Sequence, residues 1–113
     1  MKNEFNELRN YFKEVKRKKW NNGHDPYILY NNSKKAISKI EAIKSKLNNT
    51  EEIEFCDYII KELQKTSTLL ELYSLSNKKD TVIGDDMLFN KVRDNVLINL
   101  RRFLNYFDEL EED

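Results

Sequence analysis

Apolar residues recur at alternating three- and four-residue intervals in four separate segments of this chain. In the first segment, the intervals between Phe5, Leu8, Phe12 and Val15 are 3, 4 and 3 residues. This spacing places side chains on one face of an α-helix, whereas a half-buried β-strand would show apolar residues at every second position. With only two Gly and one Pro among 113 residues, the chain also has little material for β-turns. The pattern therefore predicts an all-α fold.

Turn and capping residues separate the first two helices. Gly23 can close the first helix in the left-handed conformation, and Asp25 followed by Pro26 is typical of a helix start. Ser33 is an alternative start for the second helix, because the residues just before it are poor helix formers. The segment from 21 to 26 is thus interpreted as a bend between two helices.

The second half of the chain predicts two longer helices. Asn49, three residues before Glu52, resembles a capping-box start. Two apolar stripes then indicate a largely buried third helix: Cys56, Ile60, Leu63 and Leu70, and beside them Phe55, Ile59, Leu69 and Tyr73. A polar stretch at 76–86 is expected to be a loop, and the acidic tail at 108–113 is expected to fray because negative charge is unfavourable at a helix C-terminus.

The complete prediction is a single antiparallel bundle of four helices. The predicted helices span about residues 3–20, 26–47, 50–74 and 87–110. Short links between the first three favour antiparallel neighbours, and a chain of this length is typical of one domain.

The net charge is zero, but the two halves of the chain differ strongly. Residues 1–49 carry 12 Lys/Arg and 5 Asp/Glu, a net of +7, and residues 50–113 carry 8 and 15, a net of −7. Such asymmetry indicates either complementary helical halves or a basic face for nucleic acid or a membrane together with an acidic tail. It could also build a homodimer in which the basic half of one chain faces the acidic half of another.

Several kinds of chemistry lack the residues they need. The single cysteine, Cys56, cannot form an internal disulfide, which favours a reducing cytoplasm, and it is interpreted as a buried thiol. No apolar run approaches the roughly 18 residues of a membrane span, and the first residues lack a signal-peptide core. One His and one Cys do not make a zinc site, and no Gly-rich phosphate loop is present. We therefore expect no membrane segment, metal or cofactor.

Arg17 and His24 are separated by six residues in the stretch RKKWNNGH. This spacing resembles the loose R-x4–6-H signature of the helical HEPN ribonucleases. The resemblance implies that Arg17 would steady a phosphate and that His24 would move a proton. Lys18 occupies a position where that family usually has a polar residue such as Asn or Asp, and the pair lies in the first helix rather than late in the bundle.

Two overlapping groups of residues around the first link are candidate binding sites. The basic group could grip phosphates and stack on a base: Lys13, Lys16, Arg17, Lys18, Lys19 and Trp20. The same cations are also the charges that a helix C-terminus favours. The aromatic group could form a hot spot for a protein partner: Trp20, Tyr27 and Tyr30.

No catalytic residues are predicted. The sequence favours a small, non-enzymatic, protein-binding module that acts by occupying the surface of a partner protein, as regulators, adaptors, immunity proteins and phage-type inhibitors do. The alternative is a nucleic-acid-binding accessory protein that uses the basic end of the first helix, and a HEPN-like ribonuclease is the third hypothesis.

Overall fold

The computed structural model describes the backbone of residues 2–17, 25–76 and 83–111, and the side chains of residues 2–17, 29–69 and 90–111. These residues form helices and no strand, which confirms the all-α prediction. The helices are α1 (Lys2–Arg17), α2 (Asp25–Lys44), α3 (Thr50–Ser76) and α4 (Ile83–Tyr106).

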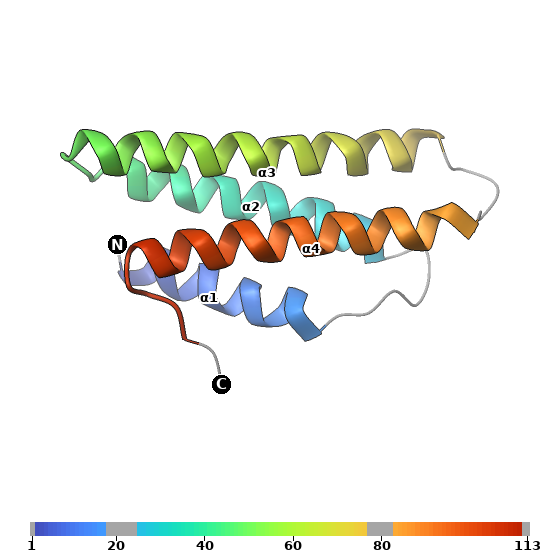
Figure 1. Ribbon diagram of the computed structural model, residues 1–113, viewed down its shortest axis with the longest axis horizontal. Coiled ribbons are helices and arrows are strands. Elements are labelled where there is room, and N and C mark those ends of the chain that lie inside the picture. Colours follow the sequence, from blue (N-terminus) through green and yellow to red (C-terminus); the bar gives the residue numbers. More distant parts are fainter. Residues whose placement is uncertain (1, 18–24, 77–82, 112–113) are drawn as a thin grey trace.

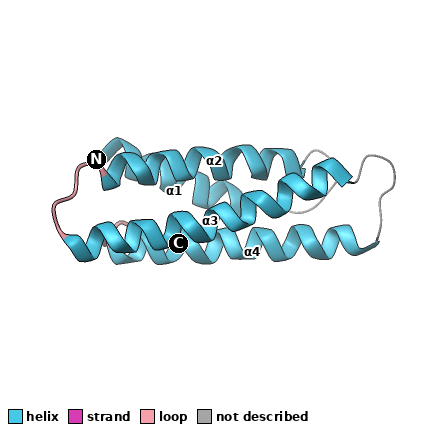
Figure 2. Ribbon diagram, turned by 90° about the horizontal axis from the view of Figure 1, so that it is seen from above, coloured by secondary structure: helices cyan, strands magenta, loops and turns pink. Residues whose placement is uncertain are grey.

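Successive helices run in opposite directions, as Figure 1 shows. α1 and α3 each pack against both α2 and α4. The molecule is elongated, 48 × 28 × 18 Å, with the helices aligned along its length (Figure 2). This is the antiparallel four-helix arrangement that the spacing predicted.

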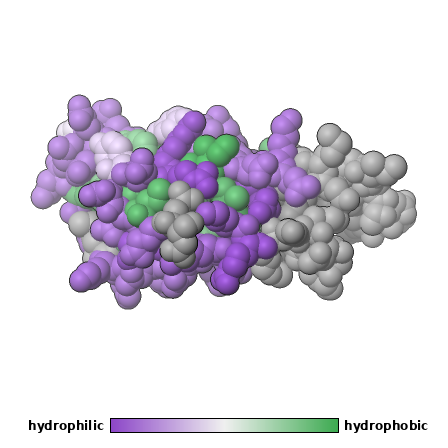
Figure 3. Space-filling view, turned by 60° about the horizontal axis from the view of Figure 1, so that its bottom comes forward, coloured by the Kyte–Doolittle hydropathy of each residue, from purple (hydrophilic) through white to green (hydrophobic). Residues whose placement is uncertain are grey.

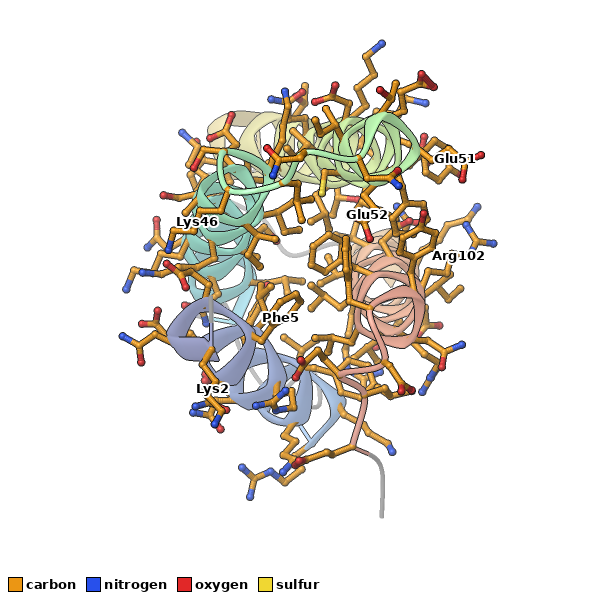
Figure 4. The ribbon with its side chains drawn as sticks, turned by 90° about the vertical axis from the view of Figure 1, so that its left-hand side faces the viewer. Lys2, Phe5, Lys46, Glu51, Glu52 and Arg102 are labelled. Carbon is orange, nitrogen blue, oxygen red and sulfur yellow. The ribbon has the colours of Figure 1, made fainter. Side chains whose placement is uncertain are left out.

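The predicted apolar seam of α1 faces the core. Phe5, Leu8, Phe12 and Val15 are all buried. Seen end-on, Phe5 points into the space between the helices (Figure 4). The apolar seam of α1 is therefore covered within the chain.

α2 begins at Asp25, next to the predicted start at Pro26, and continues through Ser33 without interruption. The alternative start at Ser33 is thus wrong. Ser33 is fully buried, and its Oγ shares a hydrogen bond of 3.2 Å with Tyr11 Oη of α1. This hydrogen bond pairs the buried Ser33 hydroxyl, which the sequence had suggested as the N-cap of the second helix.

Asn49 caps α3 as predicted, because its Oδ1 accepts a hydrogen bond of 3.1 Å from the backbone N–H of Glu52. Farther along α3, Thr66 and Thr68 donate to the carbonyls of Glu62 and Gln64, at 3.3 Å and 3.0 Å. These are the back-bonds expected of threonine within a helix, and α3 remains continuous through them.

The predicted bounds of α4 are wrong at both ends. The helix begins four residues earlier than expected, at Ile83, and ends four residues earlier, at Tyr106. Its end is a Schellman motif: Asp108 has φ 59°, the Asp108 N–H bonds the Asn105 carbonyl at 3.1 Å, and the Glu109 N–H bonds the Leu104 carbonyl at 2.7 Å. The chain turns here because Asp108 tolerates the left-handed conformation better than most residues.

The acidic tail folds back along α1, whereas sequence reasoning expected it to fray. Arg9 Nη1 donates to the Glu109 carbonyl at 3.2 Å and to Glu109 Oε1 at 2.5 Å. Leu110 is half-buried against the core. Seen from the side of α1 and the tail, hydrophobic residues gather in the middle of a largely hydrophilic surface (Figure 3).

The two oppositely charged halves of the chain contact each other through ion pairs. Lys44 Nζ lies 2.6 Å from Asp57 Oδ1, which joins α2 to α3, and the Arg9–Glu109 pair joins α1 to the tail. These contacts agree with the interpretation of the charge split as complementary helical halves.

Candidate protein interface

The large exposed hydrophobic side chains of the described residues all lie on α3 and α4. They are Tyr58, Leu69, Ile98 and Tyr106, with 47%, 49%, 42% and 45% of their surface exposed. Scattered exposed apolar residues are normal, but a set confined to two adjacent helices is typical of an interaction surface.

An aromatic cluster forms the part of this surface next to the α3 N-terminus. The rings of Phe55 and Tyr106 are stacked, with centroids 4.1 Å apart and planes 12° from parallel. Arg102 Nη1 lies 3.5 Å from Tyr58 Oη, at the limit of a hydrogen bond. Tyrosine and arginine are enriched at the centres of protein interfaces.

A shallow groove of about 430 Å³ lies farther along, between α3 and α4. Leu69 and Ile98 line its walls. Two of its polar lining residues are joined, because Asn95 Nδ2 donates to Thr66 Oγ1 at 2.8 Å. The groove is therefore lined by apolar and polar side chains together, including the exposed charges of Lys91 and Asp94, a combination suited to an anchoring side chain of a partner.

The cluster and the groove belong to one continuous stripe, which we call the α3–α4 face. On α3 it comprises Glu51, Phe55, Tyr58, Glu62, Lys65 and Leu69, separated by 4, 3, 4, 3 and 4 residues. On α4 it comprises Lys91, Asn95, Ile98, Arg102 and Tyr106. Glu51 and Arg102 point outward on the same side of the bundle in Figure 4. The face thus has helix periodicity, and its residues are exposed or partly buried, with Phe55 packed against the core.

Sequence reasoning missed this face because it assigned the same residues to the core. Phe55 and Leu69 were both placed on a buried stripe of the third helix. The available signal was a second 3–4 stripe that mixes aromatic with charged residues, since a buried stripe rarely contains Glu62 and Lys65.

Of the predicted aromatic hot spot, the structure describes only the side chain of Tyr30. Trp20 lies outside the described residues, as does the side chain of Tyr27. Tyr30 is half-buried against the core, and Lys34 Nζ lies 4.8 Å from the centre of its ring. Tyr30 is therefore partly used within the bundle.

The basic group lies partly within the described residues. Lys13, Lys16 and Arg17 are exposed on the last turns of α1, whereas Lys18 and Lys19 lie outside the described part of the chain. His24 does too, so the Arg17–His24 pair of the ribonuclease hypothesis remains a prediction.

The α1 C-terminus is held by an arginine that sequence reasoning did not single out. Arg93 of α4 donates from Nε to the Val15 carbonyl at 3.1 Å and from Nη2 to the Lys16 carbonyl at 2.9 Å. These carbonyls belong to the last described turn of α1. Arg93 thus fixes the position of the basic end on the bundle.

Two buried groups have raised pKa values and lie away from the α3–α4 face. Burial, with a smaller contribution from the Asp57 carboxylate, raises the pKa of the Cys56 thiol from 9.0 to about 11. Burial also raises the pKa of the Tyr11 phenol. Both groups are therefore neutral at physiological pH, and the thiol is a poor nucleophile.

The described residues contain no cluster of three or more His, Cys, Asp or Glu that could hold a metal ion. Within the same residues, no helix has a stretch of sufficient length and hydrophobicity to span a bilayer. A smaller groove of about 220 Å³ between α1 and α2 is lined largely by charged and amide side chains, and the Glu7–Lys39 ion pair of 2.9 Å joins its two helices.

The chain matches no protein-family model, no curated protein and no solved structure.

Proposed function

We propose that this protein is a non-enzymatic, cytoplasmic protein-binding module that acts by occupying the surface of a partner through its α3–α4 face. Regulators, adaptors, immunity proteins and phage-type inhibitors work in this way. The observation that supports the proposal is that, among the side chains that the structure describes, the large exposed hydrophobic ones lie on α3 and α4. Burying these apolar side chains together in an interface removes more apolar area from water, and so gives more binding free energy, than burying a single surface residue.

The composition of the face also fits protein recognition. Tyr58, Arg102 and Tyr106 lie together at one end, and these residue types dominate interface energetics. Tyr106 is already stacked on Phe55, so little side-chain entropy remains to be lost on binding.

A photo-crosslinking residue introduced at Ile98 tests the proposal. We expect it to form a covalent adduct with a protein in extracts of the native host, whereas the same residue at Ser38, which is exposed on α2, should form none. The adduct is then identified by mass spectrometry, and binding is reconstituted with both purified proteins. Equal labelling from Ile98 and Ser38, or none from either, would contradict the proposal.

The reconstituted complex allows a second test. Truncating Tyr106 or Ile98 to Ala should each weaken binding by at least about 1 kcal/mol, as expected of residues at an interface centre. Ser38→Ala serves as the matched control and should leave the affinity unchanged.

Nucleic-acid binding is the second candidate function, because Lys13, Lys16 and Arg17 are exposed together at one end of α1. In that case affinity for mixed-sequence RNA or DNA would fall steeply with salt, and charge reversal at these three residues would abolish it. Substitutions on the α3–α4 face would then have no effect. The two functions are separated by which set of substitutions removes binding.

A further inference from the structure

We propose that the occupant of the α3–α4 face is a second copy of the same chain, related by a two-fold axis parallel to the helices. The inference rests on the proposed function, in that this face binds protein, and it names the partner. Its basis is the distribution of charges along the two helices of the face.

Contacts between α3 and α4 fix which residues lie at the same height along the bundle. Phe55 lies level with Tyr106, Tyr58 with Arg102, and Thr66 with Asn95. A two-fold axis parallel to the helices exchanges the two sides of the face and keeps the heights unchanged. It therefore places α3 of one copy over α4 of the other at the same level, and the arrangement is isologous.

The two helices carry charges of opposite sign at nearby heights. Near the aromatic cluster, α4 carries Arg102, level with Tyr58, and α3 carries Glu62 one turn beyond Tyr58. Near the groove, Lys65 on α3 lies close to the level of Asp94, beside Asn95, on α4, and the cation Lys91 of α4 lies about one turn farther along, near the level of Leu69. The two-fold would bring acid close to base at both levels, which is the complementarity that selects one partner over others.

The charged groups are free to change partners. The side chains of Lys65 and Asp94 are 71% and 64% exposed. Lys65 Nζ lies 3.0 Å from Glu62 Oε2, and Asp94 Oδ1 lies 3.4 Å from Arg93 Nη1. Exposed ion pairs of this kind contribute little to stability, so exchanging them for contacts across the dimer costs little.

Ile98 would lie between the two charged levels. Ile98 of one copy would face the α3 of the other near Glu62, next to the groove walls formed by Leu69 and Ile98. The side chain that enters the groove of one copy would then come from the second copy.

Light scattering coupled to gel filtration tests the inference on the full chain. We expect the mass to rise from one copy to two with concentration, up to about 1 mM, where even a weak dimer is populated. Ile98→Asp should weaken association at least about a hundredfold, because it places a charge at the interface centre. Ser38→Asp is the control on α2 and should leave association unchanged.

The charge pattern is tested by reversal and restoration. Lys65→Glu and Asp94→Lys should each weaken the dimer about tenfold, because like charges then face each other across the axis. The double variant should recover to within about threefold of the parent, since the symmetry restores both contacts at once. Circular dichroism melts verify that each variant is folded. A dimer that withstands Ile98→Asp, or a double variant that fails to recover, would overturn the inference.

The experiments distinguish a failure of this inference from a failure of the proposed function. A chain that stays monomeric up to about 1 mM rejects the second copy. If the crosslinker at Ile98 nevertheless joins an identified protein that binds again on reconstitution, the proposed function stands with a different partner. If neither a dimer nor such an adduct forms, both proposals fail.

Discussion

Glu4 lies in the first turn of α1, where negative charge interacts favourably with the helix dipole. Its Oε2 is 3.1 Å from Lys46 Nζ, just beyond the end of α2. A hydrogen bond from its own backbone N–H, followed by the one from Lys46, lowers the pKa of Glu4 from 4.5 to about 2. The ionised carboxylate is therefore favoured in the folded protein.

This lowered pKa predicts a specific pH dependence of stability. The charged form of Glu4 stabilises the folded state above pH 4.5, and this contribution is lost as the pH falls toward about 2. The difference in unfolding free energy between the parent and Glu4→Gln should therefore shrink over that interval. Urea denaturation at several pH values measures it. A difference that stays constant with pH would contradict the prediction, and Lys46→Met should reduce the pH-dependent part.

Asp108 has a backbone conformation that glycine adopts more easily. Its φ of 59° is left-handed, and its carboxylate lies just beyond the C-terminus of α4. Asp108→Gly should raise the free energy of unfolding by about 0.5–1 kcal/mol, because it relieves both the backbone strain and the unfavourable charge. Asp108→Asn removes only the charge, so the gap between the two variants reports the backbone term. Thermal unfolding measures both.

At the scale of the elements, the C-terminal end of α1 is held by hydrogen bonds from a side chain of α4. Arg93→Met keeps the aliphatic part of the side chain but removes the two hydrogen bonds to the carbonyls of Val15 and Lys16. We expect a loss of about 1.5–3 kcal/mol, as is usual for hydrogen bonds to a charged group. Arg93→Lys should recover only part of it, because lysine lacks the planar fork. An unfolding free energy unchanged in Arg93→Met would show that the carbonyls find other partners.

Helix starts were predicted better than helix ends, for a physical reason. Asn49 and Asp25 mark starts through local chemistry that is visible in a few residues. The end of α4 depends on Asp108 adopting a left-handed turn and on Glu109 reaching Arg9, one hundred positions away in the sequence. A contact at that separation leaves no local signal, so the tail was expected to fray.

At the scale of the whole molecule, the folded-back tail packs against the core and α1. Leu110 is half-buried against the core, so Leu110→Ala should cost about 1–2 kcal/mol of unfolding free energy. Glu111 is exposed at the next position, and Glu111→Ala should change stability by less than about 0.5 kcal/mol. Chemical denaturation compares the two. If both variants matched the parent, the tail would be frayed after all.

The bundle as a whole was predictable because its core repeats one simple pattern. Leu8, Ile40, Leu63 and Leu100 are all buried, as the 3–4 spacing required. The α3–α4 face was not predictable from that pattern, because an apolar residue on an outer stripe has the same identity as one in the core. Only packing between helices decides that Leu69 and Ile98 remain at the surface.

Because Cys56 is buried, the reactivity of its thiol can measure how often the helical bundle opens locally. The only thiol of the chain is fully buried on α3, and its raised pKa keeps it protonated. A thiol-reactive dye can modify it only during excursions in which α3 separates from its neighbours. The labelling rate, divided by the rate for the unfolded chain, therefore gives the equilibrium constant of these excursions under native conditions. Anything bound across α3 and α4 would slow the labelling, so one cysteine could report occupancy of a surface that it does not touch.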